Sequence, residues 1–269
     1  MFEGRVALVT GAGEGIGHEI ARRLALEGAH VLLNDIDSTR AESAARAIAA
    51  EAGAAGEGPR VRAAGGDIAD IGTSRGLVER AVAELGRLDL AVANAGITLH
   101  RDFLDVRPEE LDRLLAVNLR GSYFLVQAVA RRMSEQKTGG SILLLSSVTG
   151  HLAIRQLVAY GMTKAALEAL ARNASIELAP LGITVNALAP GATLTPRTAA
   201  SAGWAEAWAG ATPDGRVASV GDVAGAALFL LSDAASHITG QTLVVDGGWT
   251  ALGAAPGVFD APGAGKVRP

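Results

Sequence analysis

The stretch VALVTGAGEGIG, residues 6–17, decides the fold. An apolar run, Val6–Val9, leads into a turn with Gly11, Gly15 and Gly17, and the helical segment EGIGHEIARRLALEG overlaps its end. A glycine pattern alone is weak evidence, but a strand before it, a helix after it and a second strand ending in an acid are the context of a dinucleotide-binding turn. The sequence therefore favours a βαβ unit whose helix N-terminus faces phosphate over an ordinary glycine-rich loop.

The rest of the chain alternates between two hydrophobic periods. Short runs rich in leucine and β-branched residues are separated by longer segments with helical spacing. Parallel strands that are covered by helices on both faces have such continuous apolar runs. The sequence predicts an α/β fold, a doubly wound parallel sheet of about seven strands flanked by helices. Its strands are expected at RVALVT, HVLLND, VRAAGGD (the weakest), LDLAVAN, SILLLSS, ITVNALA and QTLVVD.

Composition argues against several classes of protein. With 49% hydrophobic and 19% charged residues over 269 positions, the chain can bury a large core and lies within the single-domain range of an α/β fold. The net charge of -4 is spread without a long basic run, which argues against a nucleic-acid partner. There is no cysteine, and no metal is predicted. Without a signal-peptide pattern or an apolar run near the roughly 18 residues of a membrane span, we expect a cytoplasmic protein without a membrane partner.

Candidate acid–base residues lie on a helical segment in the second half of the chain. Tyr160 and Lys164, in YGMTK, are four residues apart and project from one face of that helix. A phenol ordinarily has a pKa of about 10, and a neighbouring ammonium favours its ionised form. A tyrosine and a lysine at this spacing are common, so the pair gains meaning only with partners. Two candidates precede it, Ser147 (with Ser146 beside it) in SILLLSS and Asn118 in AVNLRG.

Together these motifs resemble the classical short-chain dehydrogenase/reductase family. The glycine turn has the spacing TGxxxGxG, ANAG at residues 93–96 is similar to the family's NNAG with Ala93 in place of the first asparagine, and the serine, tyrosine and lysine follow in the family's order. APGATLTP and HITGQTLVVDGG continue the resemblance, which covers about residues 4–250. It implies a single-domain Rossmann fold at residues 1–252 and an NAD-dependent enzyme that acts on CH–OH groups.

The resemblance also implies catalytic roles. Tyr160 would carry the proton, Ser147 would hold the substrate oxygen, and Lys164 would contact the nicotinamide ribose and favour the phenolate. Asn118 would help to hold a water between the lysine and solvent, from within a long helix expected over residues 108–136. In the oxidation direction the alcohol would lose its proton to the tyrosine and its hydride to NAD, with the cofactor supplying the redox chemistry.

Cofactor choice depends on the acids near the first two strands. In this family the residue at Asp35, at the end of HVLLND, accepts hydrogen bonds from the adenosine ribose, and its charge would exclude a 2′-phosphate. Glu14 stands in the glycine turn, where members that use NADPH often carry a base, and Ile36 adds no positive charge. Two acids without a cation favour NAD(H). The alternative is that Asp35 and Asp37 only begin a turn and cap the helix from Ser38 onward.

Further cofactor contacts follow from the same resemblance. Asp67 in GGDI matches the aspartate that bonds the adenine amino group, with the backbone of Ile68 beside it, and Thr195 matches the threonine that bonds the nicotinamide carboxamide. The complete expected cofactor set is Gly11, Glu14, Gly15, Ile16, Gly17, Asp35, Asp67, Ile68, Asn94, Ala95, Gly96, Tyr160, Lys164, Pro190, Gly191 and Thr195.

The substrate pocket is the least defined part of the site. Residues 195–215 occupy the family's variable substrate lid, in which Trp204 and Trp208 are four residues apart, as on one face of a short helix. They would roof an apolar pocket or, with equal weight, pack as ordinary helix residues. His151 or Gln156 would bind a second polar group of the substrate. The pocket wall is expected from Ser147, His151, Leu152, Gln156 and Leu157.

Three functions fit these residues. The leading one is an NAD(H)-dependent oxidoreductase that interconverts a secondary alcohol or polyol and its ketone. A 3-oxoacyl-[acyl-carrier-protein] reductase is second, because Glu14 and Asp35 argue against the NADPH that such enzymes usually use. A non-catalytic nucleotide-binding scaffold is third, because the serine, tyrosine and lysine are all present.

Two helical segments and the end of the chain indicate how subunits are expected to assemble. LRGSYFLVQAVA and MTKAALEALARNASIELA are apolar around more of their circumference than a one-sided surface helix needs, which fits the homotetramer implied by the family. The alternative is that packing within one subunit, around its own sheet, already buries both faces of these helices. Residues 253–269 form a tail rich in glycine, alanine and proline, which should be disordered unless it docks on a neighbouring subunit.

Overall fold

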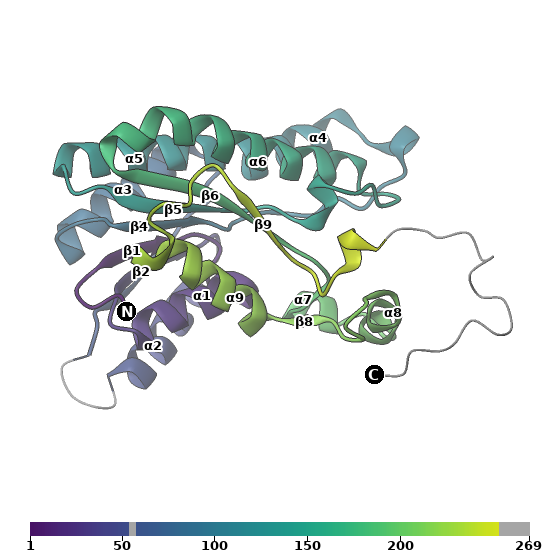
Figure 1. Ribbon diagram of the computed structural model, residues 1–269, viewed down its shortest axis with the longest axis horizontal. Coiled ribbons are helices and arrows are strands. Elements are labelled where there is room, and N and C mark those ends of the chain that lie inside the picture. Colours follow the sequence, from purple (N-terminus) through teal and green to yellow (C-terminus); the bar gives the residue numbers. More distant parts are fainter. Residues whose placement is uncertain (54–57, 253–269) are drawn as a thin grey trace, which may run out of the picture.

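The central sheet of the protein is parallel and lies between two layers of helices. The computed structural model describes residues 1–53 and 58–252, so the expected C-terminal tail lies outside the described residues. Figure 1 shows the sheet between its helical layers. Its strands are β1 (Val6–Val9), β2 (His30–Asp35), β3 (Val61–Gly65), β4 (Leu90–Ala93), β5 (Gly140–Leu145), β6 (Ile183–Pro190) and β9 (Thr242–Val245).

The order of these strands is β3-β2-β1-β4-β5-β6-β9, and every neighbouring pair is parallel. This confirms the predicted doubly wound Rossmann fold. The order reverses between β1 and β4, where β1 pairs with β2 on one side (Val6 opposite His30) and with β4 on the other (Ala7 opposite Leu90). In such sheets ligands bind at the carboxyl ends of the strands beside the reversal.

Each face of the sheet is covered by its own helical layer (Figure 1). Alternate residues of β1 enter different cores, with Ala7 and Val9 in one and Val6 and Leu8 in the other, because side chains alternate along a strand. The first core includes α1 (Gly15–Leu26), α2 (Ser38–Ala52) and α9 (Val220–Leu231), and the second includes α3 (Ile71–Leu85), α5 (Ser122–Gln136) and α6 (Val158–Leu178).

The helix expected over residues 108–136 is divided in three. It begins as α4 (Pro108–Leu115), continues as a π-helical turn, Ala116–Gly121, and ends as α5. A π-turn changes the backbone hydrogen-bond pattern without ending the helical path. Gly121 lies tightly against the segment after β3, since an added Cβ would meet the carbonyl oxygen of Ile68 at 2.6 Å.

The expected lid region contains more structure than its sequence suggested. β7 (Thr193–Leu194) and β8 (Ala218–Ser219) pair as a small parallel sheet that was not predicted. Between them lie α7 (Pro196–Ala199) and α8 (Trp204–Ala211). Short 3-10 turns complete the described chain at Phe103–Asp105, Val148–Gly150, Ala179–Leu181, Asp233–Ala235 and Trp249–Ala251.

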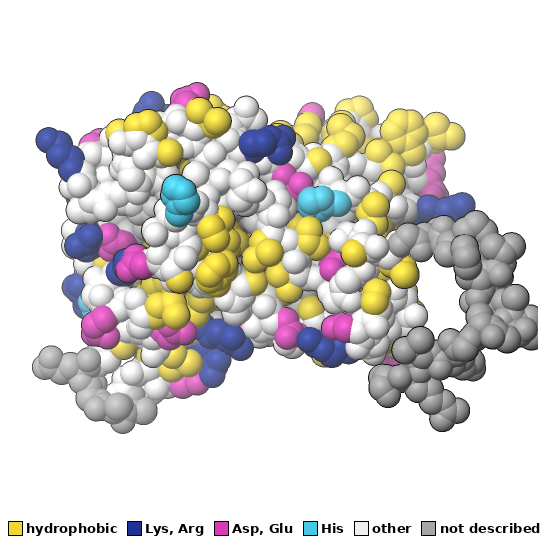
Figure 2. All heavy atoms as spheres, in the orientation of Figure 1, with side chains coloured by type: hydrophobic (Ala, Val, Ile, Leu, Met, Phe, Trp, Pro, Cys, Tyr) yellow, Lys and Arg dark blue, Asp and Glu magenta, His cyan; other side chains and the backbone are white. Residues whose placement is uncertain are grey.

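Charged side chains of both signs are interspersed on the face of the molecule that Figure 2 shows, so basic residues do not gather into one extended stripe there among the described residues. None of the helices in the described chain combines the length and apolar character that a membrane crossing needs. Within residues 1–53 and 58–252 there is no group of three or more histidine, aspartate or glutamate side chains that suits a metal ion.

Candidate active site

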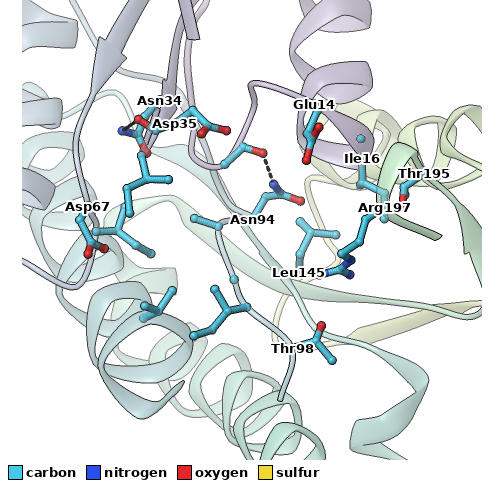
Figure 3. A pocket seen from close by; sticks show the side chains of 18 of the residues that line it. Glu14, Ile16, Asn34, Asp35, Asp67, Asn94, Thr98, Leu145, Thr195 and Arg197 are labelled. Carbon is cyan, nitrogen blue, oxygen red and sulfur yellow. Dashed lines mark hydrogen bonds between the residues drawn. The ribbon is translucent and has the colours of Figure 1, made fainter. Parts of the chain in front are cut away.

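A cavity of about 320 Å³ lies at the carboxyl ends of β1, β2 and β4, where the strand order reverses, and extends to those of β5 and β6 (Figure 3). The structure brings almost the whole expected cofactor set to this cavity, from segments far apart in the sequence. The members that line it are Gly11, Glu14, Gly15, Ile16, Asp35, Asp67, Ile68, Asn94, Ala95, Gly96, Tyr160, Lys164, Pro190 and Thr195.

The remaining two members of the set, Gly17 and Gly191, do not line the cavity. A Cβ on Gly17 would overlap the side chain of Asn94, whose Nδ2 donates to the carbonyl oxygen of Gly11 at 2.8 Å. A Cβ on Gly191 would come within 2.7 Å of the Asp246 Cβ. Both positions therefore need glycine for close packing of the walls.

The turn after β1 leaves backbone donors for an anion. Gly11 and Gly15 have φ values of 61° and 66°, a left-handed conformation that favours glycine. A Cβ on Gly11 would lie only 2.7 Å from the Ala95 Cα. Glu14 is the N-cap of α1 but makes no side-chain hydrogen bond to its first turn. The first N–H groups of α1 therefore remain available to a phosphate beside Gly15 and Ile16.

Asp35 faces the cavity from the end of β2 (Figure 3). Its two carboxylate oxygens accept hydrogen bonds from the backbone N–H groups of Gly13 and Asp37, each at 3.1 Å, which fixes its orientation. Asp37 instead caps α2 by accepting from the N–H of Arg40 at 3.1 Å. The capping alternative thus holds for Asp37, whereas Asp35 is oriented toward the cavity.

The expectation that Glu14 and Asp35 stand at the cavity without a cation near them is wrong. Arg40 lies between them, with Nη1 3.2 Å from Glu14 Oε1 and Nη2 3.4 Å from Asp35 Oδ1, and it lines the cavity. In the sequence, the one sign of this contact was that Arg40 falls in the first turn of α2, shortly after Asp35. The reach of its long side chain back across the glycine turn was not foreseen.

A second carboxylate–arginine pair also lines the cavity. Asp67 accepts from the Ala69 N–H at 3.0 Å and pairs with Arg113 of α4 at 2.7 Å. Burial acts to raise the pKa of Asp67, but these two partners more than offset it, and its pKa lies below the ordinary value. Arg113 also lines the cavity, although nothing near it in the sequence indicated this.

Tyr160 and Lys164 stand together on α6, as their spacing predicted. The ammonium nitrogen of Lys164 lies 5.5 Å from the centre of the Tyr160 ring and donates to the carbonyl oxygen of Leu145 at 2.6 Å. The lysine side chain is buried, so its charge acts in a medium of low dielectric constant. This arrangement suits stabilisation of a phenolate.

The two serines after β5 differ in their contacts. Ser146 lines the cavity, but its hydroxyl donates to Glu168 Oε1 at 2.6 Å. Ser147 caps the Val148–Gly150 turn, where its hydroxyl accepts from the Thr149 N–H at 3.2 Å. A hydroxyl that accepts a hydrogen bond retains its proton for another partner, so the contacts leave Ser147 the better candidate for holding a substrate oxygen.

Asn118 lies in the π-helical turn and connects three segments. Its Oδ1 accepts from the Ile97 N–H at 2.8 Å, and its Nδ2 donates to the Ile97 carbonyl at 2.9 Å and to Thr163 Oγ1 at 3.1 Å. Thr163 in turn donates to the Tyr160 carbonyl at 2.7 Å. The side chain therefore joins the loop after β4 to the helix that carries Tyr160, a link that the sequence did not reveal.

Thr195 and Arg197 border the cavity on the lid side (Figure 3). Thr195 caps α7 by accepting from the Thr198 N–H at 3.3 Å. Arg197 has no carboxylate within 4.0 Å among the described residues. It was not predicted, and it places a cation without a carboxylate partner, among the described residues, on the wall of the cavity that Tyr160 and Lys164 also line.

The expected substrate wall, Ser147, His151, Leu152, Gln156, Leu157, Trp204 and Trp208, does not line this cavity. His151 Nε2 lies 3.1 Å from Glu168, and Gln156 donates to Asp102 at 3.2 Å. Trp204 packs against Trp208 with ring centres 6.2 Å apart, and Trp208 packs edge-on against Trp249 at 5.3 Å. A substrate role for these residues stays a prediction.

Comparison with known proteins gives consistent relatives. A family model described as enoyl-(acyl carrier protein) reductase matches residues 11–250. An L-rhamnose 1-dehydrogenase (NAD(P)(+)) of Sphingomonas sp. is 38% identical over 251 residues, covering 92% of this chain and 97% of that protein. The 3-oxoacyl-[acyl-carrier-protein] reductase FabG of Escherichia coli is 37% identical over 248 residues, covering 92% and 98%.

A solved structure agrees over nearly the whole chain. The 3-ketoacyl-(acyl-carrier-protein) reductase of Brucella melitensis, complexed with NADH, superposes with a TM-score of 0.85 at 35% sequence identity. The match covers 93% of this chain and 100% of that one. The likeness therefore extends over the whole Rossmann fold.

Proposed function

We propose that this chain, which belongs to the short-chain dehydrogenase/reductase family, interconverts a secondary alcohol or polyol and its ketone with NAD(H). Its relatives named above are NAD(P)-dependent oxidoreductases that act on CH–OH groups. One observation carries the proposal. A single cavity joins the glycine turn and Asp35 to the Tyr160–Lys164 pair, so the residues suited to a dinucleotide and those suited to acid–base chemistry share one site.

The residues present fit a dinucleotide. The uncapped first turn of α1 suits the pyrophosphate, and Asp35 suits the adenosine ribose. We call the part of the cavity around Glu14, Asp35, Arg40 and Asp67 the adenosine end. The part around Tyr160, Lys164 and Thr195 is the catalytic end. When bound, the nicotinamide supplies the hydride acceptor or donor.

Proton transfer falls to the chain's own residues. In the oxidation direction Tyr160, as phenolate, takes the proton of the alcohol while the Ser147 hydroxyl holds the alcohol oxygen. Lys164 stabilises the phenolate by its buried charge. In reduction the same groups work in reverse, with Tyr160 donating the proton to the forming alkoxide. Asn118 keeps the loop after β4 and the tyrosine helix in register, as its three side-chain hydrogen bonds support.

NAD(H) is the preferred cofactor in this proposal. Asp35 and Glu14 both face the position that a 2′-phosphate would take, and like charges in close contact are costly. Arg40 compensates part of that charge, so we expect a finite preference instead of exclusion.

A 3-oxoacyl-[acyl-carrier-protein] reductase is the second candidate, supported by the relative of 37% identity from E. coli. One experiment separates the two. Oxidation of L-rhamnose, other aldoses, polyols and secondary alcohols is compared with reduction of 3-oxoacyl thioesters, using both cofactors at matched concentration. The proposal expects the highest kcat/KM with a polyol or secondary alcohol and NAD, whereas an aldose oxidised at C1 as the best substrate would make the product a lactone instead of a ketone. A thioester with NADPH as the best pair would favour the second candidate, and dinucleotide binding without any turnover would favour a scaffold.

A homotetramer is the proposed assembly. Large apolar side chains stay exposed on the two helices that the sequence marked as apolar on a second face: Tyr123 on α5, and Val158, Met162 and Ile176 on α6. Exposed apolar side chains concentrated on neighbouring helices suit burial against another subunit. Light scattering tests this, and a monomeric mass at micromolar concentration would contradict it.

A further inference from the structure

The turn that carries Ser147 is closed by one carboxylate. Glu168 lies on α6, one helical turn after Lys164, and its side chain is only 11% exposed. Its Oε1 lies 2.6 Å from the hydroxyl of Ser146 and 3.1 Å from Nε2 of His151. These two residues flank the Val148–Gly150 turn that Ser147 begins. Both ends of the turn therefore meet at one oxygen atom.

The contact at the first end is a strong one. The Ser146 hydroxyl lies within hydrogen-bond distance of Glu168 Oε1 at 2.6 Å and of the Lys164 carbonyl at 3.0 Å. The charged, closer acceptor forms the stronger bond. The Ser146 N–H also donates to the Leu188 carbonyl at 2.7 Å, which fixes this end to β6. A nearly buried carboxylate needs such donors, because burial without them is costly.

The second end is fixed by close packing as well as by His151. A Cβ on Gly150 would lie 2.7 Å from Glu168 Oε1 and 3.1 Å from the Ala165 nitrogen. A Cβ on Gly161 of α6 would lie 2.8 Å from the Thr149 carbonyl oxygen. The turn thus lies directly on the helix, and a displaced Glu168 side chain would displace it.

We propose that Glu168 is a positioning residue that sets the Ser147 hydroxyl relative to the Tyr160 phenol. It joins both ends of the serine turn to the helix that carries the tyrosine, and it does not itself line the cavity. This inference rests on the proposed roles of Ser147 and Tyr160. Since the glycine turn and Asp35 hold the dinucleotide independently, loss of the contact should lower kcat and leave dinucleotide affinity unchanged.

The test compares Glu168→Leu, which removes the acceptor, with Glu168→Gln, which keeps an acceptor oxygen in place. Glu177→Gln is the matched control, since Glu177 is an exposed acid further along α6. The best substrate of the panel above gives kcat and KM, calorimetric titration gives the NADH Kd, and hydrogen exchange read by mass spectrometry reports on residues 146–152.

For Glu168→Leu we expect kcat to fall roughly ten- to a hundredfold, the cost of a slightly misplaced catalytic group. Its NADH Kd should stay within about twofold, and exchange in the serine turn should become faster. Glu168→Gln and Glu177→Gln should resemble the unchanged protein. Ser146→Ala should lower kcat less than Glu168→Leu does. The double variant should have the same kcat as Glu168→Leu alone, as expected for two groups that act through one contact.

An unchanged kcat in Glu168→Leu would overturn the proposal, and so would equal losses in Glu168→Gln and Glu168→Leu. If the leucine variant does not fold, Ser146→Ala and His151→Gln each open one side of the contact, and full kcat in both would also overturn it. Tyr160→Phe is measured in parallel. Retained turnover in that variant would contradict the proposed function itself, whatever the Glu168 variants do.

Discussion

The adenosine end and the catalytic end of the cavity hold their cations in opposite ways. At the adenosine end Arg40 lies between Glu14 and Asp35, and Arg113 pairs with Asp67. At the catalytic end the Lys164 ammonium bonds a carbonyl oxygen. Neither that lysine nor Arg197 has a carboxylate within 4.0 Å among the described residues.

This difference separates recognition from reaction. Arginines already paired with carboxylates orient those carboxylates and moderate their charge, but they add little net positive potential. An ammonium bonded to a neutral oxygen keeps its full charge for an anion that forms nearby, and in a buried site that charge acts strongly. In the proposed function, the adenosine end therefore discriminates between cofactors, and the catalytic end stabilises a phenolate and a substrate oxygen.

The largest effect is expected at the catalytic end. Tyr160→Phe keeps the ring and removes the proton carrier, so turnover should fall by about 10² to 10⁴-fold, the usual contribution of acid–base catalysis. Calorimetric titration should show unchanged NADH binding. The chain's other tyrosine supplies the control: Tyr123→Phe, on α5, should leave kcat as it is. Comparable turnover of the two variants would remove Tyr160 from the mechanism.

The next effect belongs to the adenosine end. Asp35→Asn removes one of the two charges that face a 2′-phosphate and leaves Arg40 behind, so the ratio of kcat/KM for NAD to that for NADP should shrink about tenfold, which corresponds to about 1.4 kcal/mol. Asp37→Asn is the control because it makes the same charge change and keeps a good N-cap. If the ratio of kcat/KM for NAD to that for NADP shifted equally in both variants, the effect would come from the net charge of the region and not from Asp35 in particular.

A smaller, opposite change is expected for Arg40→Gln. Without the guanidinium, Glu14 and Asp35 repel a 2′-phosphate more strongly, so the preference for NAD should widen by about two- to fivefold, the range of partly exposed ion pairs. Arg46→Gln on the same helix, whose arginine contacts Glu42 at 3.8 Å, should change neither cofactor constant. A narrowed preference in Arg40→Gln would show that Arg40 does not moderate the acids.

The smallest effect concerns stability against pH. The folded pKa of Asp67 lies below its unfolded value, so its pair with Arg113 stabilises the fold above the ordinary carboxyl range, and this contribution is lost as pH falls through the lowered pKa. Asp67→Asn should lower the free energy of unfolding by less than about 1 kcal/mol at neutral pH. The difference should begin to shrink as the pH falls below about 4, the ordinary carboxyl range, and should vanish only below the lowered pKa of Asp67 in the folded protein. Urea titrations without cofactor measure it, and a constant difference would contradict the expected linkage.

The sequence predicted those parts of the site whose residues lie close together along the chain, and it missed contacts between residues that are far apart in sequence. The strand, glycine turn and helix at the start are contiguous, and Tyr160 and Lys164 share one helix face by spacing alone, so both could be read directly. Asp35 followed from the end of its strand. Arg113 could not be foreseen, because it reaches Asp67 only after a helix, a strand and a loop have folded between them.

Other features escaped prediction because tertiary contacts create them. β7 and β8 are two residues each and exist only as a pair. The π-helical turn at Ala116–Gly121 lies tightly against the segment after β3, a contact that no hydrophobic period in the sequence records. His151 was expected on a substrate wall, yet it contacts Glu168 of α6, a partner that becomes visible only when the helix lies on the serine turn.

The aromatic packing of the lid makes the protein its own optical probe. The chain has three tryptophans, and all belong to the cluster of Trp204, Trp208 and Trp249. Indole fluorescence excited at the red edge of its absorption therefore arises from the lid and from the turn after β9 that touches it, without a contribution from the sheet. Movement of α8 relative to the turn after β9 would change how these rings stack, so an unlabelled sample in a stopped-flow fluorimeter would report that movement in real time.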